Sequence, residues 1–132
     1  MMEPYEKRII VSKADLDDLN HVNNVRYVQW IQDISKEHWQ STAPKEMQVG
    51  ILWVVKNHNI DYLSSASLGD VILAKTFVKS TKGAISVRCV EMYNGKTNGI
   101  LVRSFTEWCL LNAITLKPIR IPENIQKVFL GN

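Results

Sequence analysis

Few residues in this sequence are of the kinds that cross-link a protein or anchor it in a membrane. Only two of its 132 residues are cysteines, Cys89 and Cys109, and both lie in apolar, strand-like runs. A free thiol in such a run usually behaves as a small buried hydrophobe, so we expect no disulfide. No apolar run approaches the roughly 18 residues that a membrane-spanning helix needs, and no charged-then-apolar leader opens the chain. We therefore expect a soluble, cytoplasmic protein without a membrane span.

A strong charge of one sign is also missing. The formal net charge at pH 7 is only +3. Nucleic-acid-binding domains concentrate basic residues in a dense stripe or patch, which this small excess does not provide. The same excess suits an anionic metabolite or an acidic carrier protein. We expect no nucleic acid among the partners.

Several motifs of nucleotide and covalent chemistry are absent as well. The sequence has no Gly-rich phosphate loop, no Gly-x-Ser-x-Gly elbow and no plausible Cys–His pair. Its three histidines, His21, His38 and His58, lack the spacing of zinc ligands. We therefore expect no metal and no cofactor, and find no support for a Ser or Cys nucleophile. On the predicted helix described next, His38 falls on the buried face, and His58 is expected to be a structural strand residue.

A strongly amphipathic segment predicts one helix over residues 24–40. Its apolar positions share one face along the whole length, and the opposite face is polar. The residues expected to be buried are Tyr27, Val28, Trp30, Ile31, Ile34, Ser35 and His38. Such a face must pack against another element over the full length of the helix.

The remainder of the chain favours strands. Runs rich in β-branched and aromatic residues predict strands over 5–12, 51–62, 70–80, 84–93 and 100–112, and a short helix over 125–130. Turn residues such as Gly83 separate the later runs, so we expect antiparallel strands that pair in sequence order. The sequence has no repeat or linker. It therefore predicts a single α+β domain over residues 1–132, with a sheet that curls around the helix.

The most informative run is 15–24, directly in front of the predicted helix. It holds three carboxylates, one imidazole and three amides. A calcium loop starting at Asp15 is excluded, because Leu19, Asn20 and Arg26 stand where ligands or the turn glycine are required. A carboxylate beside a helix start can activate water or attack an acyl carbon while backbone N–H groups stabilise the oxyanion. The same residues can also simply cap a turn and the helix, so both interpretations stay open.

This run resembles the signature of the hotdog-fold acyl-CoA/acyl-ACP thioesterases of the 4-hydroxybenzoyl-CoA thioesterase-like superfamily. The matching residues are Asp15-x-Asp17-x-x-Asn20-His21-Val22-Asn23-Asn24-x-x-Tyr27. Further similarity in 53–62, 68–70, 106–108 and 116–118 extends it over essentially the whole chain. The resemblance implies a hotdog fold, with one long central helix wrapped by a curved antiparallel sheet. It also implies a homodimer or a dimer of dimers with active sites at the shared interface.

The resemblance assigns roles to individual residues in this run. It implies that Asp17 is the catalytic carboxylate, whereas Asp15 shapes the loop. The backbone N–H near Asn24 would face the thioester oxygen, and His21 and Asn23 would line or brace the site. A positioning role for His21 is favoured over proton transfer. The family usually has glycine where this chain has Asn20, and asparagine tolerates the left-handed backbone better than most residues.

Substrate-binding candidates lie elsewhere in the chain. Those for an apolar acyl slot are Trp30, Ile34, Trp53 and Tyr62, although large residues at such positions are more often ordinary core. Tyr27 is a further candidate for substrate binding. Basic residues around two adjacent predicted strands can meet the phosphates of CoA or an acidic carrier, or can be ordinary solvated charges. They are Lys79, Lys82, Arg88 and Lys96.

The sequence thus predicts an acyl thioesterase that hydrolyses acyl-CoA or acyl-ACP, with Asp17 as general base or as nucleophile. Two alternative functions remain open. Hotdog hydratases and dehydratases carry a Gly-Asp-x-Asn-Pro-x-His type segment, whose Gly and Pro are missing before His21. A non-catalytic acyl-binding protein would keep the scaffold without the activity.

Overall fold

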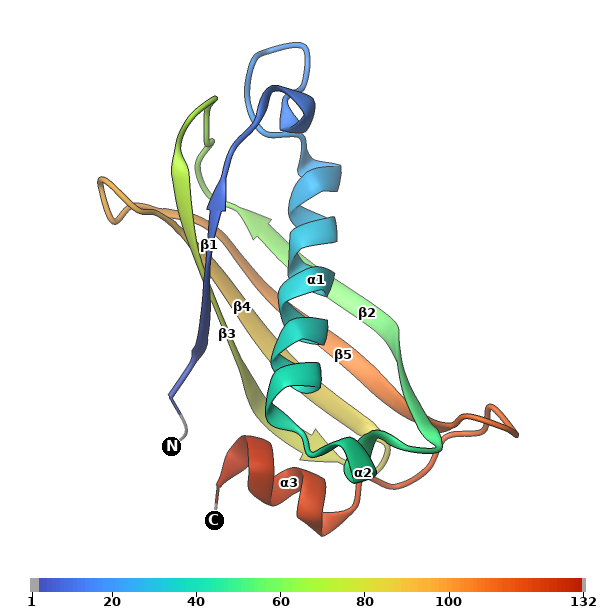
Figure 1. Cartoon of the computed structure of the whole chain (residues 1–132). Coiled ribbons are helices and arrows are strands. Elements are labelled where there is room, and N and C mark those ends of the chain that lie inside the picture. The colour runs from blue at the N-terminus through green and yellow to red at the C-terminus, as the bar shows by residue number, and fades with distance from the viewer. Residues whose placement is uncertain (1–2, 132) are drawn as a thin grey trace.

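One long helix packs against a single twisted sheet in the computed structural model, which describes residues 3–131 (Figure 1). Within these residues the strands are β1 (Tyr5–Ile10), β2 (Ile51–Tyr62), β3 (Val71–Lys82), β4 (Ile85–Asn94) and β5 (Ile100–Asn112). The helices are α1 (Asn24–Thr42), α2 (Lys45–Gln48) and α3 (Glu123–Leu130), with a 3-10 turn η1 (Lys13–Asp15). The strands, α1 and α3 agree closely with the predicted ranges, whereas α2 and η1 are too short to give a periodic signal.

The sheet is antiparallel throughout, in the order β1-β3-β4-β5-β2. The expected pairing in sequence order holds for β3, β4 and β5 but is wrong for β2, which pairs with β5. The connection 63–70 is longer than a hairpin loop, so β2 and β3 need not be neighbours. The N–H groups of Leu63 and Ser64 donate to the carbonyl of Leu101, which holds this connection across the end of β5. In this strand order β1 and β2 form the two edges of the sheet.

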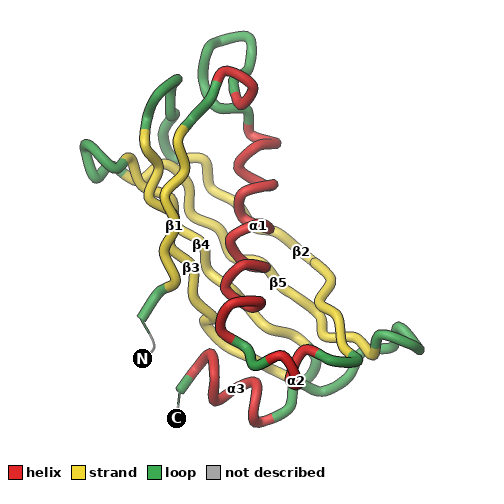
Figure 2. Tube along the Cα trace, in the orientation of Figure 1, coloured by secondary structure: helices red, strands yellow, loops and turns green. Residues whose placement is uncertain are grey.

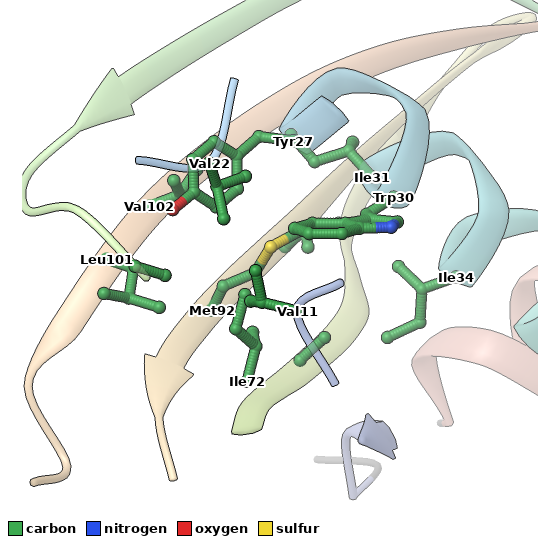
Figure 3. Packing of buried hydrophobic residues seen from close by; sticks show 13 residues of the cluster. Val11, Val22, Tyr27, Trp30, Ile31, Ile34, Ile72, Met92, Leu101 and Val102 are labelled. Atoms are coloured by element: carbon green, nitrogen blue, oxygen red, sulfur yellow. The ribbon is translucent and has the colours of Figure 1, made fainter. Parts of the chain in front are cut away.

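The predicted apolar face of α1 forms the core. Six of the seven expected residues are buried and Val28 is half-buried. Figure 3 shows Tyr27, Trp30 and Ile34 pointing from α1 toward sheet residues that include Ile72 and Met92. The amphipathic prediction is therefore confirmed, and α1 is held along its length.

A second apolar cluster lies at the C-terminal end of α1. There α3 folds back beneath the end of α1, close to α2 (Figure 1, Figure 2). Phe129 and Ile125 of α3 pack with Leu110 and Val78 of the sheet. The two thiols, Cys89 and Cys109, are free and buried as predicted. No helix within residues 3–131 is long and apolar enough to cross a membrane.

Candidate active site

Asp15 fastens the loop between β1 and α1 to the start of α1. Its buried carboxylate accepts hydrogen bonds from the Ser12 N–H (2.8 Å), the Ser12 hydroxyl (3.0 Å) and Arg26 Nε (2.6 Å). Its backbone carbonyl accepts from the Asn23 N–H at 2.9 Å. Burial acts to raise the pKa of Asp15, but the donors of Ser12 and Arg26 outweigh it and leave the pKa below its ordinary value. Asp15 is therefore an ionised anchor of the loop.

Replacing this anchor is expected to destabilise the fold. Asp15→Ala leaves the Ser12 donors unpaired, and should lower the free energy of unfolding by about 2–3 kcal/mol. Arg26→Met should cost clearly less, because the Arg26 side chain is 45% exposed and its ion pair is screened by water. Urea unfolding of the two variants measures both effects. Equal losses would mean that Asp15 acts only through Arg26.

Asp17 closes a tight turn with one of its two carboxylate oxygens. Oδ1 accepts hydrogen bonds from the Leu19 N–H at 2.9 Å and the His21 N–H at 3.1 Å. The Asp17 N–H donates to the His21 carbonyl at 2.7 Å. Oδ2 has no hydrogen-bond partner in the part of the chain that the structure describes. One oxygen therefore holds the turn, and the other is free to receive a proton or to attack a carbon.

Asn20 occupies the left-handed conformation in this turn, with φ at 61°. Its N–H donates to the Asp17 carbonyl at 3.1 Å. Asparagine is one of the few residues other than glycine that accept this conformation at small cost. The turn therefore forms with asparagine in the left-handed conformation.

The start of α1 presents an unpaired backbone donor. Asn23 is the N-cap, because its Oδ1 accepts from the Val25 N–H at 3.0 Å and its carbonyl accepts from the Arg26 N–H at 2.9 Å. The N–H of Asn24, the first helical residue, has no partner within residues 3–131. A free N–H at the positive end of a 19-residue helix is suited to stabilise an oxyanion. The capping interpretation of Asn23 is confirmed, while its contact with substrate stays a prediction.

His21 is braced through its backbone rather than its side chain. It forms an isolated bridge with Ser67, and the neighbouring Val22 N–H donates to the Ala66 carbonyl at 3.0 Å. The connection 63–70 thus supports the turn that carries Asp17. The imidazole of His21 is exposed and has no hydrogen bond to the described residues, so its role toward substrate stays a prediction.

The predicted substrate-binding residues of α1 are part of the core. Tyr27 and Trp30 are buried and meet edge to face, with ring centroids 5.6 Å apart. The buried Tyr27 hydroxyl has no hydrogen-bond partner among the described residues. Burial raises the pKa of Tyr27. Contact of these two residues with an acyl group stays a prediction.

Other predicted binding residues lie around a cavity of about 280 Å³ at the opposite end of α1. Trp53 and Arg88 line it, together with side chains of α1 and α3. Arg88 is only 6% exposed, so the expectation that it joins Lys82 on a phosphate-binding surface is wrong in its placement. The reason is the strand alternation, which turns Arg88 to the same face of β4 as buried Val90 and Met92. Lys82 is exposed at the end of β3.

The remaining histidines make structural contacts. His58 Nδ1 lies 2.7 Å from Thr106 Oγ1 across the β2–β5 pair, and burial lowers its pKa. His38 Nδ1 lies 2.7 Å from Arg88 Nη1. No group of three or more His, Cys, Asp or Glu side chains within residues 3–131 is placed to hold a metal ion. The chemistry available at the start of α1 is therefore that of a carboxylate, an imidazole and backbone N–H groups.

Comparison with known families identifies the family of proteins in which this carboxylate and helix start occur. The model of the acyl-ACP thioesterase N-terminal domain matches residues 3–129. The chain belongs to the acyl-ACP thioesterase family. That family consists of thioester hydrolases, which confirms the resemblance inferred from the 15–27 motif.

Solved structures of thioesterases have the same fold as this family member. The probable thioesterase YbaW from Escherichia coli is 20% identical, with a TM-score of 0.86 and 96% of each chain covered. Slr0204, a 1,4-dihydroxy-2-naphthoyl-CoA thioesterase from Synechocystis, is 17% identical with a TM-score of 0.81, covering 95% of this chain and 94% of its own. The 12:0-ACP thioesterase from Umbellularia californica is 16% identical with a TM-score of 0.81. The match covers 95% of this chain but only 49% of that protein. These likenesses confirm the hotdog fold, whereas no curated protein sequence matches.

Proposed function

We propose that this chain hydrolyses acyl thioesters of acyl carrier protein or coenzyme A to a free acid and a thiol. One observation carries the proposal beyond family membership. The free oxygen of Asp17 and the unpaired N–H of Asn24 belong to one loop and helix start, fastened together by Asp15. A thioester hydrolase needs both a group that activates water and a donor for the oxyanion.

In the proposed reaction, the thioester carbonyl oxygen accepts a hydrogen bond from the Asn24 N–H. Asp17 Oδ2 takes a proton from a water molecule while the oxygen of that water attacks the carbonyl carbon. The helix start stabilises the negative charge that develops on the carbonyl oxygen. Collapse of the tetrahedral intermediate breaks the C–S bond, and the proton held by Asp17 passes to the thiolate. Alternatively Asp17 attacks directly and water then hydrolyses the anhydride. Label found in Asp17 after a single turnover in ¹⁸O-labelled water would demonstrate the anhydride, because label enters Asp17 only when water attacks the aspartyl carbonyl of that intermediate.

Thiol release from a panel of acyl-ACP and acyl-CoA thioesters tests this function. We expect many equivalents of thiol per chain, and the rate with each chain length ranks the acyl preference and the carrier. Exposed Lys79, Lys82 and Lys96 are the candidates for contact with CoA phosphates or an acidic carrier. Tight binding of a thioester without thiol release would instead support the non-catalytic function. Addition of water to an enoyl thioester would support a hydratase.

We also propose that two copies pair along β2, with each active site at their interface. β2 is an edge strand of 12 residues whose outer side has no partner strand in the described chain. Leu52, Val54 and Tyr62 on this strand are exposed apolar residues, and a long apolar edge is normally covered. Light scattering should give twice the mass of one chain, or four times that mass for a dimer of dimers. A monomer at micromolar concentration would contradict the pairing.

A further inference from the structure

The cavity at the C-terminal end of α1 encloses a cation that has no ion-pair partner in the described part of the chain. Arg88 is 6% exposed, and its Nη1 donates to Thr76 Oγ1 at 3.2 Å and lies 2.7 Å from His38 Nδ1. Its guanidinium carbon lies 5.9 Å from the centre of the Phe129 ring. No carboxylate within residues 3–131 forms an ion pair with Arg88. Burying a charge without an opposite charge nearby costs folding free energy, so a buried guanidinium such as that of Arg88 calls for an anionic partner.

The neighbouring histidine does not neutralise this charge. Burial, and then the charge of Arg88, lower the pKa of His38 to about 4. Burial lowers the pKa of Arg88 to about 10, so at neutral pH Arg88 is a cation and His38 is neutral. The Nδ1 of His38 therefore accepts the hydrogen bond from Arg88. Tyr5 stacks on the imidazole of His38, with ring centroids 5.1 Å apart.

The rest of the cavity wall offers donors and apolar surface. Trp53 and Trp108 both line the cavity, and their buried indole nitrogens have no hydrogen-bond partner among residues 3–131. Trp108 is 6% exposed, so its N–H is a second buried donor on a residue that lines the same cavity as Arg88. No Asp or Glu is among the lining residues, and Trp39 and Phe129 supply aromatic walls. Buried donors of this kind are normally satisfied by an acceptor.

We propose that this cavity binds a carboxylate carried on an apolar body, with the Arg88 guanidinium as its counter-charge. The indole N–H groups of Trp53 and Trp108 supply the neighbouring donors, and the aromatic walls hold the apolar part. A cavity of about 280 Å³ is at the small end of ligand sites, which suits a medium-length acid better than a bulky cofactor. The exposed side chains of Lys36 and Gln40 among its lining residues provide a route from solvent.

The cavity is distinct from the turn that carries Asp17. Its first lining residue on α1 is Ser35, which lies about 16 Å along the helix axis from Asn24. The carboxylate can belong to a free acid, or to the far end of an acyl group whose thioester lies near Asp17. Binding of the free acid does not require that the chain hydrolyse anything.

Calorimetry with the wild-type chain and matched ligands tests the proposal without any substitution. We expect octanoate to bind at least about tenfold more tightly than 1-octanol or methyl octanoate, because only the carboxylate pairs with Arg88. Acetate should bind weakly, because it lacks the apolar body. Equal affinities for octanoate and the two neutral ligands would overturn the proposal, whether or not any variant folds.

A pair of substitutions locates the binding. Arg88→Met removes the buried charge and should weaken octanoate binding by about tenfold to a hundredfold. Arg8→Met makes the same chemical change at an exposed position on β1 and should leave binding unchanged. Unchanged octanoate binding in Arg88→Met would overturn the assignment to this cavity.

Hydrolysis of two thioesters identifies the source of the carboxylate. If the cavity holds the far end of the acyl group, Arg88→Met slows hydrolysis of a long-chain dicarboxylic monothioester selectively over its monocarboxylic counterpart. If it holds a separate free acid, the variant affects both thioesters alike, and octanoate binding persists in Asp17→Asn. A chain that binds octanoate but releases no thiol would refute the proposed hydrolysis and leave this site standing.

Discussion

Asp17→Asn is expected to slow thioester hydrolysis by about a hundredfold or more while leaving the fold intact, which is the usual loss when a general base is removed. The geometry of the turn explains the second half of this expectation. The amide oxygen of asparagine can accept the same hydrogen bonds from Leu19 and His21 that Oδ1 of Asp17 accepts. The amide nitrogen then replaces the free Oδ2, which removes both the negative charge and the proton acceptor. Steady-state thiol release measures the loss.

Asp18→Asn is the matched control. Asp18 is the neighbouring exposed carboxylate, and no hydrogen bond to its side chain occurs within residues 3–131. It should keep a rate near that of the wild type. Turnover of Asp17→Asn at the wild-type rate, with both variants folded, would remove Asp17 from the mechanism. A loss shared equally by both variants would point to the total charge of the loop instead.

Asn24→Pro is expected to lower kcat by about a hundredfold to a thousandfold, because it deletes the backbone N–H proposed to bind the oxyanion. Proline is favoured at the first position of a helix, where its missing N–H breaks no intrahelical bond. The preceding Asn23 already has φ −64° and ψ 136°, which is the extended conformation that proline requires before it. The substitution therefore removes one donor from a helix that can still form.

Asn24→Ala separates the backbone from the side chain. It keeps the N–H and removes the amide, so its kcat should stay close to that of the wild type. Circular dichroism and urea unfolding should show that both variants keep the helix. Equal activity in Asn24→Pro and the wild type would show that the oxyanion is stabilised by another group.

The sequence predicts the scaffold of the site well, because that scaffold depends on local patterns. The helical period of Tyr27, Trp30 and Ile34 reports one buried face, and that face is the one packed on the sheet. Asn20 adopts the left-handed conformation that its chemistry permits. The turn and the helix start therefore follow from residues close together in the chain.

Contacts between distant residues could not be predicted in the same way. The pairing of β2 with β5 depends on the path of the connection 63–70, which no local pattern records. The cavity at the end of α1 is closed by α3, from the far end of the chain. The burial of Arg88 did leave a signal, because it alternates in phase with Val90 and Met92 along β4. Its positive charge suggested a surface role, whereas the alternation indicated the core.

Thiol release under multiple turnover, with the wild type and Asp17→Asn measured side by side on the best thioester of the panel, is the most direct test of the central claim. The account predicts many equivalents of thiol per wild-type chain and a rate lower by about a hundredfold or more in the variant. Wild-type protein that binds the thioester without releasing thiol, or a variant as fast as the wild type, would contradict the assignment of hydrolysis to Asp17.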